Sequence, residues 1–324
     1  KDWLTNKVDR CVGGRVAKQQ CTGPLQLPLN NCGVMALDYD THQGIATSIG
    51  HSPISGLIDP EAASRLSIAE ALTNIIWAPI KNGMEGISLS ANWMWACKNQ
   101  GEDARLYQAV QACADFAIEL GINIPTGKDS LSMKQKYPDQ EVIAPGTVII
   151  SAAGHCTDIR KVIEPTLIAD GGDIFYINMS FSDYQLGGSS FAQVISKIGQ
   201  NAPDVSDANK FKAAFNVLQS LIQDNQIVAG HDVGSGGLIT TLLEMTFAGI
   251  NSGAEFRLDH LTETDSIKLL FAENVGIVFQ AKLGQEESII SAFNEVTVPC
   301  VRIGKFKSGG TVSIVNGKDS FALD

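Results

Sequence analysis

Residues 230–249, "GHDVGSGGLITTLLEMTFAG", decide the interpretation of this chain. An apolar run at 227–230 leads to His231 and Asp232, three glycines follow within positions 234–237, and a helix-like apolar pattern completes the stretch. Glycines let a backbone approach a ligand closely, and the start of a helix presents free N–H groups. The stretch therefore predicts a phosphate-binding turn in which Asp232 holds a cation. An ordinary turn, with Asp232 capping the helix and His231 as an orienting or packing residue, remains an alternative.

A second polar pattern lies in "AEALTNI", residues 69–75, where Glu70 and Asn74 are four positions apart. That spacing places both side chains on one face of a helix. A carboxylate and an amide oxygen together suit Mg²⁺. The alternative is a polar stripe that faces the solvent.

A third pattern, "PTGKDSLSMK" at 125–134, brings a cation, an acid and a hydroxyl together at Lys128, Asp129 and Ser130. The spacing is not that of the common phosphate-binding loop, so an exposed turn is the competing interpretation. Lys18, in "GGRVAKQQ", belongs to a weaker pattern that is also typical of a solvated strand edge.

Composition limits the classes of protein. The 324 residues carry a formal net charge of −11, with 44% hydrophobic and 18% charged residues. This balance predicts a globular protein with a sizeable core and argues against a nucleic-acid surface, which would need clustered Lys and Arg. The sequence contains no run of 18 apolar residues, so no membrane span is predicted. Seven scattered cysteines without a metal-binding spacing are typical of reduced thiols, which predicts a cytoplasmic protein.

Strand-like and helix-like segments alternate irregularly along the chain, which predicts an α/β or α+β fold. A polar stretch at 157–172 predicts the boundary between an N-terminal lobe, residues 1–160, and a C-terminal lobe, residues 170–324. Strands are expected at 11–18, 32–40, 45–50, 87–96, 146–156, 174–179, 227–232, 300–306 and 311–316, and a strand followed by a loop is expected at 122–133. Helices are expected at 59–78, 101–121, 190–199, 210–225 and 237–248, and the segments 267–282 and 287–296 complete the C-terminal lobe.

The order of the motifs is more specific than any one of them. "HQGIATSIGHSP", "AEALTNI", "LSANWM", "GEDARLY", "IPTGKDSLSMK" and "GHDVGSGGL" follow one another over nearly the whole chain. In this order they resemble the second half of the synthetase region of large-type phosphoribosylformylglycinamidine synthases, in the aminoimidazole ribonucleotide synthetase superfamily. The resemblance implies an N-lobe with a mixed sheet that pairs with a partner lobe, followed by an α+β C-lobe.

The resemblance also implies an activity. Members convert formylglycinamide ribonucleotide, ATP and glutamine to the amidine: ATP phosphorylates the amide oxygen, and ammonia from a glutaminase domain displaces phosphate. The implied cofactors are Mg²⁺ and ATP or ADP, and the implied partners are the first synthetase repeat and the glutaminase domain. The chain, which starts without methionine, would then be an excised half, inactive alone and prone to form a homodimer through its bare sheet. Another enzyme of the superfamily, or a non-catalytic nucleotide-binding half, is the alternative.

Residue roles follow from the same resemblance. Glu70, Asn74 and Asp232 match magnesium ligands of an auxiliary nucleotide site, and position 31 completes that set. Lys1, Asn30, Asn31 and Gly234 match nucleotide-contacting positions, and Lys128, Asp129 and Ser130 match a turn at the catalytic centre. Two residues depart from the pattern. Asn31 stands where many members have a metal-binding Asp, and Gly234 stands where many have Ser.

Overall fold

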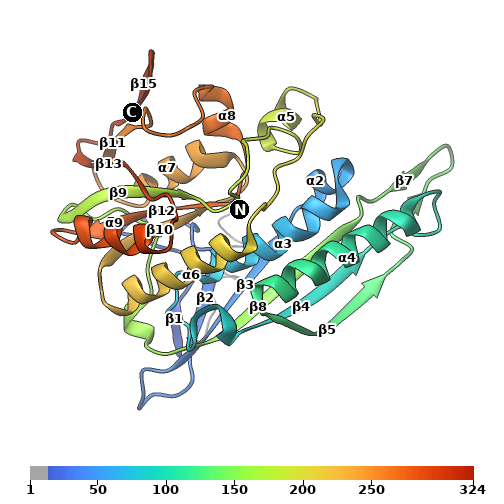
Figure 1. Cartoon of the computed structure of the whole chain (residues 1–324), viewed down its shortest axis with the longest axis horizontal. Helices are drawn as coiled ribbons and strands as arrows, with labels where there is room; N and C mark the ends of the chain where they lie inside the picture. Colours follow the sequence, from blue (N-terminus) through green and yellow to red (C-terminus); the bar gives the residue numbers. More distant parts are fainter. Residues whose placement is uncertain (1–13) are drawn as a thin grey trace.

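The computed structural model describes residues 14–324 and divides the strands between two sheets (Figure 1). The first sheet has six strands in the order β1-β2-β3-β8-β4-β5, and only the β4–β5 pair is parallel. Its strands are β1 (Val16–Lys18), β2 (Cys32–Ala36), β3 (Gly44–His51), β4 (Ile87–Met94), β5 (Asn123–Ser130) and β8 (Thr147–Cys156). A two-stranded hairpin, β6 (Lys134–Lys136) with β7 (Glu141–Ile143), projects from it.

The second sheet has seven strands in the order β10-β12-β9-β13-β11-β14-β15, with β11–β14 as its parallel pair. Its strands are β9 (Gly171–Asn178), β10 (Ile227–Val233), β11 (Ser252–Arg257), β12 (Gly276–Lys282), β13 (Val301–Ser308), β14 (Val312–Asn316) and β15 (Asp319–Leu323). The helices are α2 (Pro53–Ile58), α3 (Pro60–Ile75), α4 (Glu102–Leu120), α5 (Ser190–Val194), α6 (Ala208–Gln223), α7 (Gly237–Phe247), α8 (Ser266–Phe271) and α9 (Glu286–Glu295). Short 3-10 turns occur at η2 (Gly83–Gly86) and η3 (Ile159–Lys161).

Helix α3 begins and packs as its sequence requires. Asp59 caps it by accepting hydrogen bonds from the backbone N–H groups of Glu61 and Ala62 at 2.9 and 3.0 Å, and Pro60 occupies the first helical position. The helix lies directly on strand β3, because a Cβ at Gly50 would come within 2.3 Å of the backbone of Ser67 and Ala71. Glycine at this position therefore sets the close approach on which the site depends.

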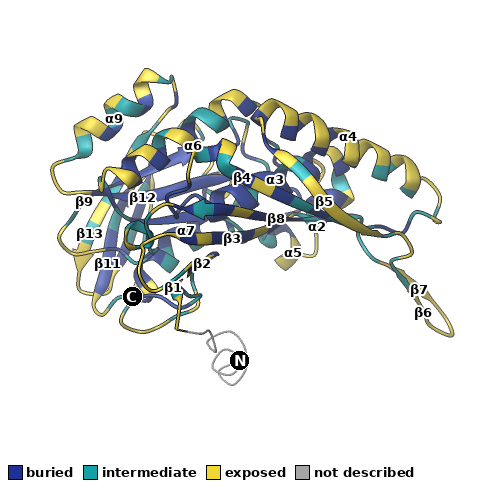
Figure 2. Ribbon diagram, turned by 90° about the horizontal axis from the view of Figure 1, so that it is seen from below, coloured by how far each residue is buried: buried dark blue, intermediate teal, exposed yellow. Residues whose placement is uncertain are grey.

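The first sheet keeps one face open. Burial alternates along β2 and β3, so one face packs on α3 and the other carries exposed apolar side chains, among them Met35, Ile45 and Ile49 (Figure 2). The larger hydrophobic core joins both lobes, since it contains Leu72 and Trp77 together with Phe211 and Phe279.

Three sequence expectations for local structure are wrong. The stretch at 128–130 lies in β5 and not in a turn, because it continues the parallel pairing with β4. The helix expected at 190–199 ends at Val194, which is 83% exposed, and Ser196 adopts a left-handed φ of 57°. Ala192 is buried and Phe191 packs on Phe271, but Val194, Ile195 and Ile198 remain exposed, so nothing stabilises a longer helix there. Lys18 is 3% exposed instead of lying on a solvated edge.

Candidate functional site

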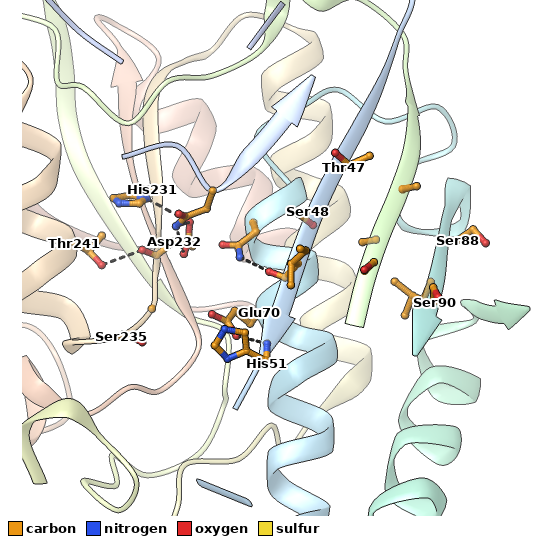
Figure 3. A pocket seen from close by; sticks show the side chains of 18 of the residues that line it. Thr47, Ser48, His51, Glu70, Ser88, Ser90, His231, Asp232, Ser235 and Thr241 are labelled. Carbon is orange, nitrogen blue, oxygen red and sulfur yellow. Dashed lines mark hydrogen bonds and ion pairs between the residues drawn. The ribbon is translucent and has the colours of Figure 1, made fainter. Parts of the chain in front are cut away.

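A cavity of about 860 Å³ opens between the first sheet, α3 and the β10–α7 turn (Figure 3). Its size falls within the range of small-molecule sites. The cavity collects many of the residues that the sequence singles out, namely Asn31, Glu70, Asn74, Asp232 and Gly234. Hydroxyl-bearing residues of the sheet line the opposite wall, including Ser88, Ser90 and Ser151.

Hydrogen bonds to β3 fix the two polar residues of α3. The Asn74 amide donates to the carbonyl of Ile49 at 2.8 Å, and the backbone N–H of His51 donates to Glu70 Oε2 at 2.6 Å. Asn74 is 5% exposed, so the pair does not form a polar stripe facing the solvent. Figure 3 shows Glu70 beside the end of β3, on the side that faces Asp232.

Asp232 lies near the end of β10 and is 3% exposed. The Asn31 amide donates to both of its carboxylate oxygens at 3.1 Å. The N-cap of α7 is Gly236, which makes no side-chain capping bond, so the alternative that Asp232 caps this helix is not what the structure has. Asp232 is a buried acid on the cavity wall.

His231 is held between two acids. Its Nδ1 lies 3.3 Å from Asp232 Oδ1, and its Nε2 lies 2.8 Å from Glu244 Oε2. Burial opposes the charged ring, but the hydrogen bonds and negative charges of Asp232 and Glu244 outweigh it and raise the pKa of His231 to about 9. The ring thus orients Asp232, in agreement with an orienting role.

Burial also dominates at Glu70. It raises the pKa of this carboxyl to about 7, with the negative charges of Asp232 and Glu273 adding to the effect and the His51 N–H opposing it. Such a cluster of acids favours a bound cation. Asn74 Oδ1 supports this reading, because it is buried without a hydrogen-bond partner among the described residues. Two carboxylates and one unpaired amide oxygen fit an oxygen-coordinated ion such as Mg²⁺.

The described residues contain no group of three or more His, Cys, Asp or Glu side chains arranged to hold a metal. The oxygen donors at this cavity therefore do not form a closed protein cage.

Other predicted residues lie apart from the cavity. Asn30 donates to Glu164 Oε2 at 2.7 Å and to the carbonyl of Gln19 at 2.8 Å, and it does not line the cavity. Lys128 donates to Ser130 at 2.6 Å on the exposed edge strand β5, where Asp129 lies beside them. Thr126 of the same strand does line the cavity. Lys1 lies outside the described residues.

Two charged residues near the turn have contacts that the sequence did not predict. Lys18 donates from its buried Nζ to the carbonyl of Ile163; burial lowers its pKa, and the charges of Cys32, Glu164 and Asp232 oppose that shift. Glu273 Oε1 accepts the backbone N–H of Gly236 at 2.7 Å, so one N–H that the sequence leaves free for phosphate is already used. Lys18 stood in a weak pattern that did not indicate burial, and Glu273 belongs to no motif.

Comparisons with known proteins agree with this architecture. Residues 1–155 match the FGAR-AT PurM_N-like domain, and residues 172–316 match the C-terminal domain of AIR synthase related proteins. The human phosphoribosylformylglycinamidine synthase is 39% identical over 317 residues, which are 97% of this chain and 24% of that protein. A probable phosphoribosylformylglycinamidine synthase of Caenorhabditis elegans is 41% identical over 94% of this chain and 24% of its own length. The chain thus spans about a quarter of these relatives.

Solved structures share the fold. The Thermotoga maritima PurL complexed with FGAR has a TM-score of 0.71 at 14% identity, over 91% of this chain and 47% of that one. The same protein complexed with ADP has a TM-score of 0.70 at 14% identity, over 98% and 47%. Escherichia coli HypE, a hydrogenase maturation protein, has a TM-score of 0.60 at 17% identity, over 86% and 85%. The expected mixed-sheet N-lobe and α+β C-lobe are confirmed.

Proposed function

Because the chain belongs to the phosphoribosylformylglycinamidine synthase family, as part of its synthetase region, we propose that it contributes a Mg²⁺-dependent nucleotide site to that enzyme. The observation that carries this proposal is the convergence of Glu70, Asn74 and Asp232 on one cavity beside a glycine-rich turn. Carboxylate and amide oxygens are the donors that Mg²⁺ prefers. Mg²⁺ bound there would supply positive charge that neutralises phosphate oxygens, because no Lys or Arg is among the described residues that line the cavity.

The complete protein is proposed to convert formylglycinamide ribonucleotide to the amidine with ATP and glutamine-derived ammonia. An amide oxygen is a poor leaving group until it is phosphorylated, so this chemistry depends on positioning and charge neutralisation. The relatives' names and the solved PurL complexes with FGAR, ATP and ADP support the assignment. A cytoplasmic location is also proposed, and the free thiols of Cys32, Cys97, Cys113, Cys156 and Cys300 support it.

The chain's own residues have distinct proposed tasks. Glu70, Asn74 and Asp232 hold the cation, and His231 orients Asp232. Gly234 lets the backbone approach a phosphate, and Asn31 donates from its amide at the same wall. Nucleotide contacts of Lys1 and Asn30 remain proposals from the family resemblance.

Lys128, Asp129 and Ser130 are proposed to act at a catalytic centre completed by another part of the protein, because they lie on an exposed edge strand. The exposed apolar face of β2 and β3 is proposed to pair with the first synthetase repeat, or with a second copy of this chain. In the complete protein a glutaminase domain would supply ammonia.

A non-catalytic role for this nucleotide, as a structural component of the enzyme, is the second candidate. The buried network around Asp232 favours it, because a ligand held there would stabilise both lobes. The two candidates differ in one measurement. A catalytic nucleotide exchanges during each turnover, whereas a structural one does not.

Calorimetry of ADP with the full-length protein, with and without Mg²⁺, tests the shared part of the proposal. We expect binding only with Mg²⁺, and none for adenosine, which lacks the phosphates. Binding that persists after chelation of Mg²⁺, or no ADP binding at all, contradicts the proposed site.

A further inference from the structure

Glu273 connects the glycine-rich turn to a distant segment of the chain. One carboxylate oxygen, Oε1, accepts the backbone N–H of Gly236 and that of Ser190, both at 2.7 Å. Gly236 precedes α7, and Ser190 begins α5. Hydrogen bonds from N–H groups to a carboxylate are stronger than neutral ones. The two segments are thus fastened to each other through a single side chain.

The neighbouring residue, Asn274, holds the same segment. It is 1% exposed, accepts the backbone N–H of Gln185 at 3.2 Å, and donates to the carbonyl of Asp183 at 3.1 Å. Residues 273 and 274 therefore fix the segment 183–190 at two points. Beyond this segment, the chain contacts α3 at Asp204, which accepts two hydrogen bonds from Arg65 at 2.7 Å.

The position of Glu273 also decides which N–H groups remain for a ligand. Gly236 has a φ of +93°, a conformation that favours glycine, and its N–H points to the carboxylate. Gly234 and Ser235 line the cavity, and their N–H groups have no hydrogen-bond partner within the described residues. With Gly236 occupied by an internal anion, an external phosphate would bind at Gly234 and Ser235.

We propose that Glu273 is a positioning residue of the phosphate-binding turn, and that it couples binding at this turn to the order of segment 183–190. The inference rests on the proposed nucleotide site. No sequence motif contains Glu273, and it does not line the cavity, so it acts through Gly236 and not by touching the ligand.

Three variants of the full-length protein test the proposal by calorimetry with Mg²⁺ and ADP. Glu273→Ala leaves two N–H groups without an acceptor, and we expect about a tenfold loss of affinity. Glu273→Gln keeps an acceptor of the same shape, and binding within about threefold of wild type is expected. The matched control is Glu287→Ala, on the same lobe, whose side chain is 88% exposed; it should bind as wild type.

Amide hydrogen exchange of the wild type gives a test without any substitution. ADP should slow exchange at both Gly236 and Ser190, while the amides of α9 keep their rates. A response at Gly236 with none at Ser190 overturns the coupling. Unchanged affinity in Glu273→Ala, or equal losses in Glu273→Ala and Glu273→Gln, overturns the positioning role. A wild type that binds no ADP contradicts the proposed nucleotide site itself, whereas a wild type that binds ADP with any of the outcomes above contradicts only the role of Glu273.

Discussion

Replacing Asp232 with Asn is the sharpest test of the cavity. Asp232→Asn keeps the shape of the side chain but removes one of two carboxylates from the proposed cation site, and its new amide faces the Asn31 amide that now donates to both oxygens at 3.1 Å. Because outer partners of a metal ligand already change affinity by about 10- to 100-fold, losing the ligand itself should weaken Mg²⁺-dependent ADP binding by at least about a hundredfold.

The same change should cost stability, because Asp232 is 3% exposed and contacts His231. Loss of a charged hydrogen-bond acceptor predicts a decrease of about 1–3 kcal/mol in the free energy of unfolding. This exceeds the change of about 0.5 kcal/mol expected for substitution of an acid that faces open solvent. The fold should survive, since domains are stable by about 5–15 kcal/mol.

Calorimetry of ADP with Mg²⁺ and denaturant unfolding without ligand measure the two effects separately. Asp224→Asn, at an exposed carboxylate that follows α6, is the matched control and should change neither quantity. If Asp232→Asn binds ADP within threefold of wild type, Asp232 does not hold the cation, and the reasoning from cavity to function is refuted.

Three further predictions concern other parts of the molecule. Asn31→Asp replaces a hydrogen-bond donor to Asp232 by a second acid, so without metal the free energy of unfolding should fall by about 1–3 kcal/mol. Mg²⁺ should restore this stability, and equal denaturation with and without MgCl2 would argue against the prediction. Ile45→Glu, on the exposed sheet face, should abolish self-association in sedimentation while the melting temperature stays nearly constant, and a wild-type chain that is already monomeric would contradict the pairing. Burial raises the pKa of Cys113 to about 12, so its alkylation at pH 8 should be roughly a thousandfold slower than in the unfolded chain; equal rates by mass spectrometry would show that the thiol is accessible.

Much of the fold could be predicted from local sequence patterns. The cap at Asp59 and the proline after it predicted the start of α3, and the spacing of Glu70 and Asn74 placed both on one helix face, as found. The strand, glycine turn and helix at 227–248 could also be predicted, because each depends on residues that are neighbours in the sequence. These elements supply the acidic part of the cavity wall, and strands of the first sheet supply the rest of it.

Contacts between residues far apart in the sequence could not be predicted. Lys18 is buried against Ile163, a partner 145 positions away, and nothing near Lys18 in the sequence distinguishes it from an exposed strand residue. Glu273 is likewise an isolated acid after a short helix, and its role depends on meeting Gly236 and Ser190 in space. The prediction of a longer helix at 190–199 is wrong for the opposite reason, since an apolar pattern predicted burial of Val194, Ile195 and Ile198, which remain exposed.

The core shared by the two lobes has a consequence for how the chain melts. Leu72 and Trp77 belong to the first half of the chain, whereas Phe211 and Phe279 belong to the second, yet all four lie in one cluster. Separating the halves near residue 165 would leave each with a large apolar surface in water. The two lobes on either side of the polar stretch are therefore not independent folding units. Heat should disrupt both sheets in a single cooperative transition.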